Sequence, residues 1–178
     1  NCMSKLEGRP FTNSDTCDGV AYPADGAPLD FSEVHIHGRY PTTGFARNNE
    51  SHEIVHVLHG VGRLIFAAGE ETSLETGQVA HVPARQWFAW EGDMKLGMSC
   101  SLPFNTEQYD VFEIDVGDEV FMRVHQALDV YFPEDKLFVE MEGMDLDDIV
   151  GFLHGQLIEV GEDPDEIFRD FGITEEES

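Results

Sequence analysis

The sequence has few cysteines, few basic residues and no long hydrophobic segment. Its three cysteines are widely spaced and form no C-x-x-C pair, so we expect reduced thiols rather than disulfides. No apolar run approaches the ~18 residues needed to span a bilayer. The first residues also lack the apolar core of a signal peptide. The expected location is therefore the cytoplasm.

Acidic residues greatly outnumber basic ones, 36 to 10, which gives a net charge of −26. Residues 110–178 hold 22 of the acids and 3 of the bases, a net charge of −19, so the charge is uneven. Such a field repels nucleic acid and anionic membranes. It suits a basic protein partner, divalent cations or a salty cytoplasm, and it is equally typical of a solvated face that keeps a protein soluble.

The chain divides into three segments by composition. Residues 1–30 are rich in Gly, Pro, Asp, Asn and Ser, and we expect an irregular arm with at most one short strand, near residues 20–22. Residues 31–109 show short alternating segments separated by turn signals, which predict a β-sandwich or barrel. In this segment we expect Gly60 to end one strand and residues 91–93 to form a turn between two others. Residues 110–178 form an acidic extension.

Helical spacing replaces the alternation after about residue 118. Apolar residues recur at helical intervals over residues 119–132 and again over 144–161. Asp145 or Asp147 is expected to cap the second helix. A third, short helix is predicted with Asp163 at the N-cap and Pro164 at the first helical position. These helices either pack on the barrel and close its open end or form a separate module.

Two sequence blocks resemble the motifs of a known family. The first cupin motif reads G-x5-H-x-H-x3,4-E-x6-G, and Glu53 followed six residues later by Gly60 matches its second half. The second reads G-x5-P-x-G-x2-H-x3-N, and Gly77 and Pro83 match it. The chain is similar to the cupin superfamily over roughly residues 44–92. This resemblance implies a mainly β fold, a jelly-roll barrel (double-stranded β-helix), here with an acidic α-helical C-terminal extension.

The resemblance does not extend to the metal-binding histidines. By the motif spacing, the first two should stand at Arg47 and Asn49 or at Ala46 and Asn48, and the third falls on Phe88. A transition metal needs several imidazole or carboxylate ligands converging on it. We therefore expect a metal-free member without a cofactor, whose catalytic residues, if any, are unknown.

A ligand pocket is the expected use of such a barrel. The residues predicted to line it combine an aromatic floor with one acid, one guanidinium, one amide and one imidazole: Glu53, Arg47, Asn49, His81, Phe88 and Trp90. This set suits a sugar or a small carboxylate. The alternative is that the aromatic rings fill the barrel and that Glu53 pairs with Arg47 or Arg85.

The sequence thus favours a small-molecule binding or assembly protein with an acidic helical region for a basic partner. The resemblance also implies a homodimer. The alternative is an enzyme, either a metal-free sugar isomerase or epimerase with His81, His35 or Glu53 as the base, or a lyase or dioxygenase with relocated ligands. The relocated site would hold a divalent transition metal on His35, His37 and His81.

Overall fold

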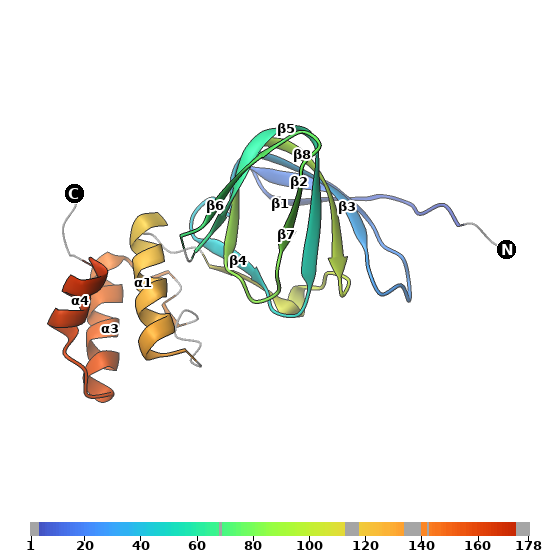
Figure 1. Cartoon of the computed structure of the whole chain (residues 1–178). Coiled ribbons are helices and arrows are strands. Elements are labelled where there is room, and N and C mark those ends of the chain that lie inside the picture. The colour runs from blue at the N-terminus through green and yellow to red at the C-terminus, as the bar shows by residue number, and fades with distance from the viewer. Residues whose placement is uncertain (1–3, 68, 113–117, 134–139, 142, 174–178) are drawn as a thin grey trace.

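The computed structural model describes residues 4–67, 69–112, 118–133, 140–141 and 143–173. Strands dominate its first two thirds and helices the remainder, as the change of period predicts (Figure 1). The strands are β1 (Arg9–Ser14), β2 (Cys17–Tyr22), β3 (Phe31–Tyr40), β4 (Phe45–Asn48), β5 (His52–Phe66), β6 (Glu71–Glu75), β7 (Val79–Val82), β8 (Phe88–Ser101) and β9 (Tyr109–Phe112). A short 3₁₀ helix, Thr106–Gln108, precedes β9.

The strands of the described segments form one antiparallel sheet that curls into a barrel-like wall (Figure 1). Its main path runs β1-β2-β3-β8-β4-β9, and β5 pairs with β6, β7 and β8. Alternation places one set of side chains inside the curl and the other outside. In β3, Val34 and Ile36 point inward and are 5% and 0% exposed, whereas His35 and His37 are exposed. The predicted barrel of mainly β structure is confirmed.

Two of the strands are longer than the sequence predicts. Gly60 lies inside β5 rather than at its end, and residues 91–93 lie inside β8 rather than in a turn. The reason is that β5 and β8 pair along nearly their whole lengths, with Gly62 opposite Gly92. A Cβ atom on Gly60 would lie 2.0 Å from the Asp93 carbonyl oxygen, so the two backbones approach too closely for a side chain. These glycines permit bending of a paired strand instead of ending it.

The segment expected to be an irregular arm contains two strands. β1 pairs with β2, and β2 pairs with β3 in a register that sets Cys17 opposite Ile36. The Cys17 side chain points inward and is 1% exposed. Residues 9–22 therefore extend the sheet and contribute to its interior, a role that composition alone does not reveal.

The three described helices are α1 (Asp118–Tyr131), α3 (Leu146–Glu159) and α4 (Pro164–Phe171). The Asp145 carboxylate caps α3 by accepting from the Asp148 amide at 2.9 Å. Asp163 caps α4 in the same way, with Pro164 at its first position. Gly172 ends α4 in a left-handed conformation, with φ of 68°. Of the two cap candidates for α3, Asp145 is the one observed, and the predicted Asp163 cap of α4 is confirmed.

The helices pack on the outer face of the barrel rather than inside its mouth (Figure 1). One core cluster joins barrel residues such as Phe45, Trp87 and Phe112 to helix residues such as Phe121 and Leu153. The rings of Phe45 and Phe121 lie 4.6 Å apart. A second cluster lies inside the curl. The helices therefore pack on the barrel, as the first of the two predicted arrangements has it, but they cover an outer face and, among the described residues, none of theirs lines the cavity, so the expected closing of the open end is not observed.

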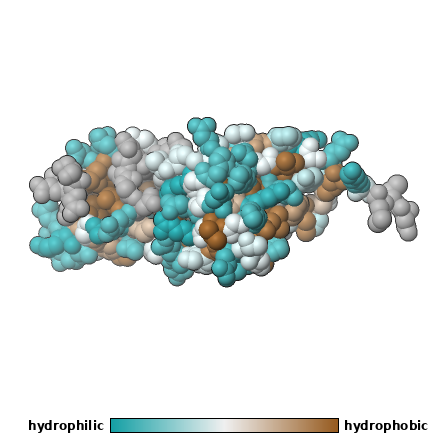
Figure 2. Space-filling model, turned by 90° about the horizontal axis from the view of Figure 1, so that it is seen from above, coloured by the Kyte–Doolittle hydropathy of each residue, from teal (hydrophilic) through white to brown (hydrophobic). Residues whose placement is uncertain are grey.

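On the face shown in Figure 2, hydrophilic residues predominate and apolar residues form scattered patches. Exposed apolar side chains on the barrel include Ile54, Val61 and Val79. None of the described helices is long and apolar enough to cross a membrane.

Candidate functional site: the barrel cavity

A cavity of about 550 Å³ opens inside the curled sheet. Its wall is made by the inward side chains of β1, β2, β3, β5, β8 and β9, and segments near residues 23–32 and 103–104 flank it. Aromatic rings supply much of the lining, and the polar side chains in it are few. The aromatic members are Phe11, Tyr22, Phe31, Tyr40, Phe88, Trp90, Phe104 and Tyr109. A volume of this size lies within the range of small-molecule sites.

Glu53 is the central polar group of this cavity. The side chain projects inward from β5, between the exposed Ile54 and His52, and is only 4% exposed. One carboxylate oxygen, Oε1, accepts a hydrogen bond from the Asn48 side-chain amide at 2.8 Å. The Cys100 thiol lies 3.9 Å from the same oxygen. The other oxygen, Oε2, is buried and has no hydrogen-bond partner among the described residues.

A chain of amide groups holds Glu53 in place. The Gln108 side-chain nitrogen donates to Asn48 Oδ1 at 2.9 Å, and Asn48 in turn donates to Glu53. The Gln108 side-chain oxygen accepts from the backbone amides of Glu50 and Ser51, each at 3.2 Å. Asn48 and Gln108 are 1% and 4% exposed. Because each amide in the chain is hydrogen bonded, the carboxyl group is fixed in one orientation.

Burial raises the pKa of Glu53 to about 7, since the charged form loses its hydration. The hydrogen bond from Asn48 acts in the opposite direction, and the negative charge of Asp30 raises the pKa further. Asp30 itself accepts hydrogen bonds from the backbone amides of Cys100 and Phe104, at 2.9 and 2.8 Å. Near neutral pH, Glu53 therefore exists in both protonation states, and its free oxygen is able to accept or donate a hydrogen bond.

Two tyrosines form a second polar group in the cavity. The hydroxyls of Tyr40 and Tyr109 are 3.0 Å apart, so one donates to the other. Burial raises the pKa of Tyr109, and the neighbouring Tyr40 and Glu53 add to the effect. Burial likewise raises the pKa of the Cys17 thiol to about 11 and that of Cys100 still further. Tyr109 and both cysteines are therefore neutral at physiological pH, and the thiols are poor nucleophiles.

Of the residues predicted to line a pocket, Glu53, Phe88 and Trp90 do line this cavity. The Phe88 and Trp90 rings are 1% and 2% exposed and meet edge to face, with centroids 6.2 Å apart. They form one wall and leave the cavity open, so the aromatic rings do not fill the barrel. Glu53 pairs with Asn48 rather than with Arg47 or Arg85.

Arg47 and Asn49 lie outside the cavity. Both donate to the Asp110 carboxylate on the neighbouring strand β9, at 3.2 and 3.0 Å. The Arg47 guanidinium also stacks over the Trp87 ring at 4.3 Å, within the layer that the helices cover. The inward positions of β4 are instead Ala46 and Asn48. The motif spacing allows either Arg47 and Asn49 or Ala46 and Asn48. Strand pairing turns Ala46 and Asn48 inward, whereas the predicted pocket contained Arg47 and Asn49.

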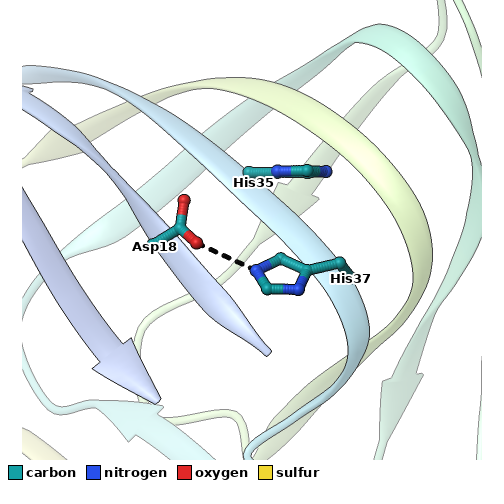
Figure 3. A group of neighbouring side chains, drawn as sticks. All are labelled: Asp18, His35 and His37. Atoms are coloured by element: carbon teal, nitrogen blue, oxygen red, sulfur yellow. Dashed lines mark hydrogen bonds and ion pairs between the residues drawn. The ribbon is translucent and has the colours of Figure 1, made fainter. Parts of the chain in front are cut away.

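The predicted histidines also lie outside. The His81 ring on β7 is exposed, and its Nε2 is 3.0 Å from Nδ1 of His52 on β5. His35 and His37 lie on the outer face of β3, where His37 is hydrogen bonded to Asp18 (Figure 3). His35 lies beside Asp93. Among the described residues, the group that could hold a metal comprises Asp18, His35 and His37 and does not include His81. The three predicted metal ligands therefore do not converge.

The residues inside the barrel do not fit the metal centre typical of cupins. Ala46, Asn48 and Phe88 occupy the inward positions that the motif assigns to histidines, and Glu53 is the one motif ligand present. The Asn48 amide nitrogen donates a hydrogen bond to Glu53, whereas two ligands of one cation would both direct lone pairs at the ion. An apolar ring, a methyl group and one carboxyl do not make a transition-metal site.

Four residues of the site, Asn48, Gln108, Tyr40 and Tyr109, are not among those predicted from the sequence to line it. The inward position of Asn48 could have been predicted, because successive side chains of a strand point to opposite faces and Arg47 precedes it. The two tyrosines stand 69 residues apart and meet through the pairing of β3 and β4 with β8 and of β4 with β9, which no local pattern encodes.

No protein-family model matches the chain, and no curated protein matches it in sequence. Solved structures do match. A structure of Streptomyces Pac13 with uridine has a TM-score of 0.55 and 16% identity, covering 61% of this chain and 90% of Pac13. Another structure describes Pac13 as a nucleoside dehydratase. A protein from Planctomyces limnophilus has a TM-score of 0.50 and 14% identity, covering 62% of this chain and 94% of its own. At these identities the similarity establishes the fold, which is that of a cupin-type barrel.

Proposed function

Since this chain has a cupin-type barrel, we propose that its cavity binds a small uncharged molecule with a planar or apolar part and hydroxyl or carbonyl groups. The observation that carries the proposal is the free Oε2 atom of Glu53. It is a buried carboxyl oxygen in a cavity wall, with no hydrogen-bond partner among the described residues. An unsatisfied buried polar group of this kind costs about 1–3 kcal/mol, which a ligand hydroxyl or amide would recover.

The lining argues for an uncharged ligand. No Lys, Arg or His is among the described residues that line the cavity, whereas the acidic residues Asp30 and Glu53 both line it. The chain as a whole carries a net charge of −26. An anionic ligand would lose hydration without gaining a cationic partner. With Arg47 outside, a sugar-like ligand fits the site better than the small carboxylate that the sequence also allowed.

Nucleosides are the first class to test. A nucleoside joins a flat base, which would stack on Phe88 and Trp90, to a hydroxylated sugar, which would reach Glu53 and the Tyr40–Tyr109 pair. The presence of uridine in the Pac13 structure supports this choice of probe.

The test is isothermal titration of the protein with uridine and with a panel of nucleosides, nucleobases and neutral sugars. We expect saturable binding that weakens about tenfold in Glu53→Gln, because the lost interaction is of the order of one buried hydrogen bond. Glu75→Gln is the matched control, since Glu75 is an exposed glutamate outside the cavity. Binding that is unchanged in Glu53→Gln would contradict the proposed contact, and no binding by any panel member would contradict the proposal itself.

A second candidate function is proton transfer on the bound ligand. The pKa of Glu53, about 7, suits a general acid or base at neutral pH. Tyr109, whose pKa responds to the charge of Glu53, would supply the complementary proton donor. Because His35 and His81 lie outside the cavity, neither is placed to act as the base of an isomerase or epimerase. Deuterium incorporation from heavy water into a bound ligand, lost in Glu53→Gln and kept in His81→Ala, would support this function.

The acidic helical region is a separate part of the proposal. Its charge and the acids in the first turns of α3 and α4, such as Asp147 and Glu166, suit a basic protein partner. Such an association would weaken steeply with salt. The homodimer implied by the resemblance also stays a prediction, which sedimentation of the purified protein tests.

A further inference from the structure

A group of potential metal ligands lies on the outer face of the barrel, separate from the cavity. Alternation along β3 turns Val34 and Ile36 toward the cavity and leaves His35 and His37 outside. The pairing of β2 with β3 sets Asp18 directly opposite His35. Figure 3 shows the three side chains gathered on this face, with the Asp18 carboxylate directed at the His37 ring.

The ligand atoms of this group are already close together. One atom from each of Asp18, His35 and His37 lies within 4.8 Å of the others. Nε2 of His37 is 2.9 Å from Oδ2 of Asp18, and the two imidazole rings have centroids 4.8 Å apart. Ligands bonded to one transition-metal ion at about 2.1 Å stand roughly 3–4 Å from each other, so small side-chain rotations suffice. All three side chains are partly exposed, which permits such rotations.

We propose that Asp18, His35 and His37 form a surface site for a divalent transition metal of the zinc type. Two imidazoles and one carboxylate are a donor set that suits Zn²⁺ and its neighbours, and imidazole disfavours Mg²⁺ and Ca²⁺. The exposed position leaves the remaining coordination positions to water. The strong negative charge of the chain raises the local concentration of cations.

A fourth side chain lies within reach. Oδ1 of Asp93, on β8, is 3.1 Å from Nε2 of His35. In the metal-free protein this contact and the one between Asp18 and His37 are ordinary hydrogen bonds of exposed histidines. In the metal-bound protein Asp93 is expected to turn away or to accept from the other ring nitrogen of His35, as carboxylates beside metal-bound histidines do.

Metal at this position would join β2 to β3, two neighbouring strands near one edge of the sheet. Binding to the folded protein alone stabilises it, because the three ligands are dispersed in the unfolded chain. A concentration of free Zn²⁺ one hundred times the dissociation constant should raise the Tm by about 5 °C or more.

The chain offers a matched control. His52 and His81 form another exposed cross-strand histidine pair, with ring nitrogens 3.0 Å apart, but they belong to no group of three ligands among the described residues. The pair tests whether any two neighbouring surface histidines would give the same result. It also lies on β5 and β7 rather than on β2 and β3.

The experiment is isothermal titration of chelator-treated, untagged full-length protein with zinc chloride, paired with thermal melts. We expect one site of micromolar or tighter affinity in the unaltered protein and in His52→Gln/His81→Gln. We expect the site to be lost in His35→Gln/His37→Gln and weakened at least tenfold in Asp18→Asn, with Zn²⁺-free melts close to that of the unaltered protein in each case.

Three results would overturn the assignment. The first is the absence of saturable zinc binding in the unaltered protein. The second is retention of the site in His35→Gln/His37→Gln, or its loss in the control pair. The third is an unchanged affinity in Asp18→Asn, which would remove the carboxylate from the site. The cavity plays no part in this test, so its outcome is independent of the proposed ligand function.

Discussion

Trp87 and Phe88 are neighbours in the chain, but their side chains have different surroundings. Trp87 is packed against Phe112 at 4.8 Å, in the core that the helices cover. Phe88 faces the other way and lines the cavity. The outer face of this wall is filled with apolar side chains, whereas the inner face keeps open space and a buried carboxyl. The difference indicates that the outer face provides stability and that the inner face is available for a ligand.

The largest effect on stability should come from a substitution in the apolar core between the outer face of the barrel and the helices. Phe121→Ala removes a ring that is 1% exposed and packed on Phe45, and we expect it to cost about 3–5 kcal/mol of the free energy of unfolding. Urea denaturation measures this loss. Val130→Ala on the same helix, where the side chain is 61% exposed, should change stability by less than about 0.5 kcal/mol. A small effect of Phe121→Ala would mean that the helices are not part of the barrel's core.

The second effect is a pH dependence of stability that comes from Glu53, on the inner face that lines the cavity. The pKa of Glu53 is about 7 in the folded protein, against 4.5 for an ordinary glutamate. Between these values the folded state holds a proton that the unfolded state releases, so this group lowers stability as pH rises from 4.5 to 7. Glu53→Gln removes that loss, and we expect it to raise stability at pH 8 by up to about 3 kcal/mol relative to its effect at pH 4.5.

Denaturant titrations of Glu53→Gln at several pH values measure this difference. The control is again Glu75→Gln, an exposed glutamate outside the cavity. A pH profile of Glu53→Gln that is parallel to that of the unaltered protein would show that Glu53 ionises normally.

The third prediction concerns Asn48, which connects the carboxyl to Gln108. Asn48→Ala removes one hydrogen bond from each of two buried groups, the Glu53 carboxyl and the Gln108 amide, and we expect a loss of about 1–3 kcal/mol in the free energy of unfolding. The pKa of Glu53 should also rise, since the hydrogen bond from Asn48 lowers it. The pH dependence of unfolding reports both effects, and a pH profile unchanged from that of the unaltered protein would disprove the link.

The smallest effect should come from Arg47, one position earlier and on the outer face. Arg47→Lys keeps the charge near Asp110 but loses the planar stacking on Trp87, and we expect a cost of about 0.5–1 kcal/mol. Ligand binding in the cavity should not change. Uridine titration of Arg47→Lys and Asn48→Ala side by side tests whether the two faces act separately. Loss of binding in Arg47→Lys would show that they do not.

The sequence predicted the barrel and the helices because those features depend on local patterns. Alternation marked β3 and the first part of β5, and Asp163 and one of the two candidate caps, Asp145, marked the starts of α4 and α3. Glu53, Phe88 and Trp90 were placed correctly on the inner face because the motif resemblance and the strand period agree there.

The remaining features of the site depend on strand pairing. The motif permits two spacings, and the choice of Ala46 and Asn48 over Arg47 and Asn49 follows from the pairing of β4 with β9. Likewise, β5 and β8 each run through glycines that look like turn signals in the sequence, because the two strands pair along nearly their whole lengths. Each was predicted as two shorter strands. The tyrosine pair requires β9, a strand of four residues that lies at the edge of the predicted barrel segment.

The hydrogen-bond chain from Glu53 through Asn48 to Gln108 also affects the order of events during biosynthesis. Asn48 and Gln108 are 60 residues apart, and Tyr109 follows directly. A nascent chain that has been synthesised only through β8 can pair its long strands and already contains Asn48, but it lacks both Gln108, which donates to Asn48, and Tyr109, the second tyrosine of the cavity. A ligand would therefore find the complete cavity only after residue 109 has left the ribosome.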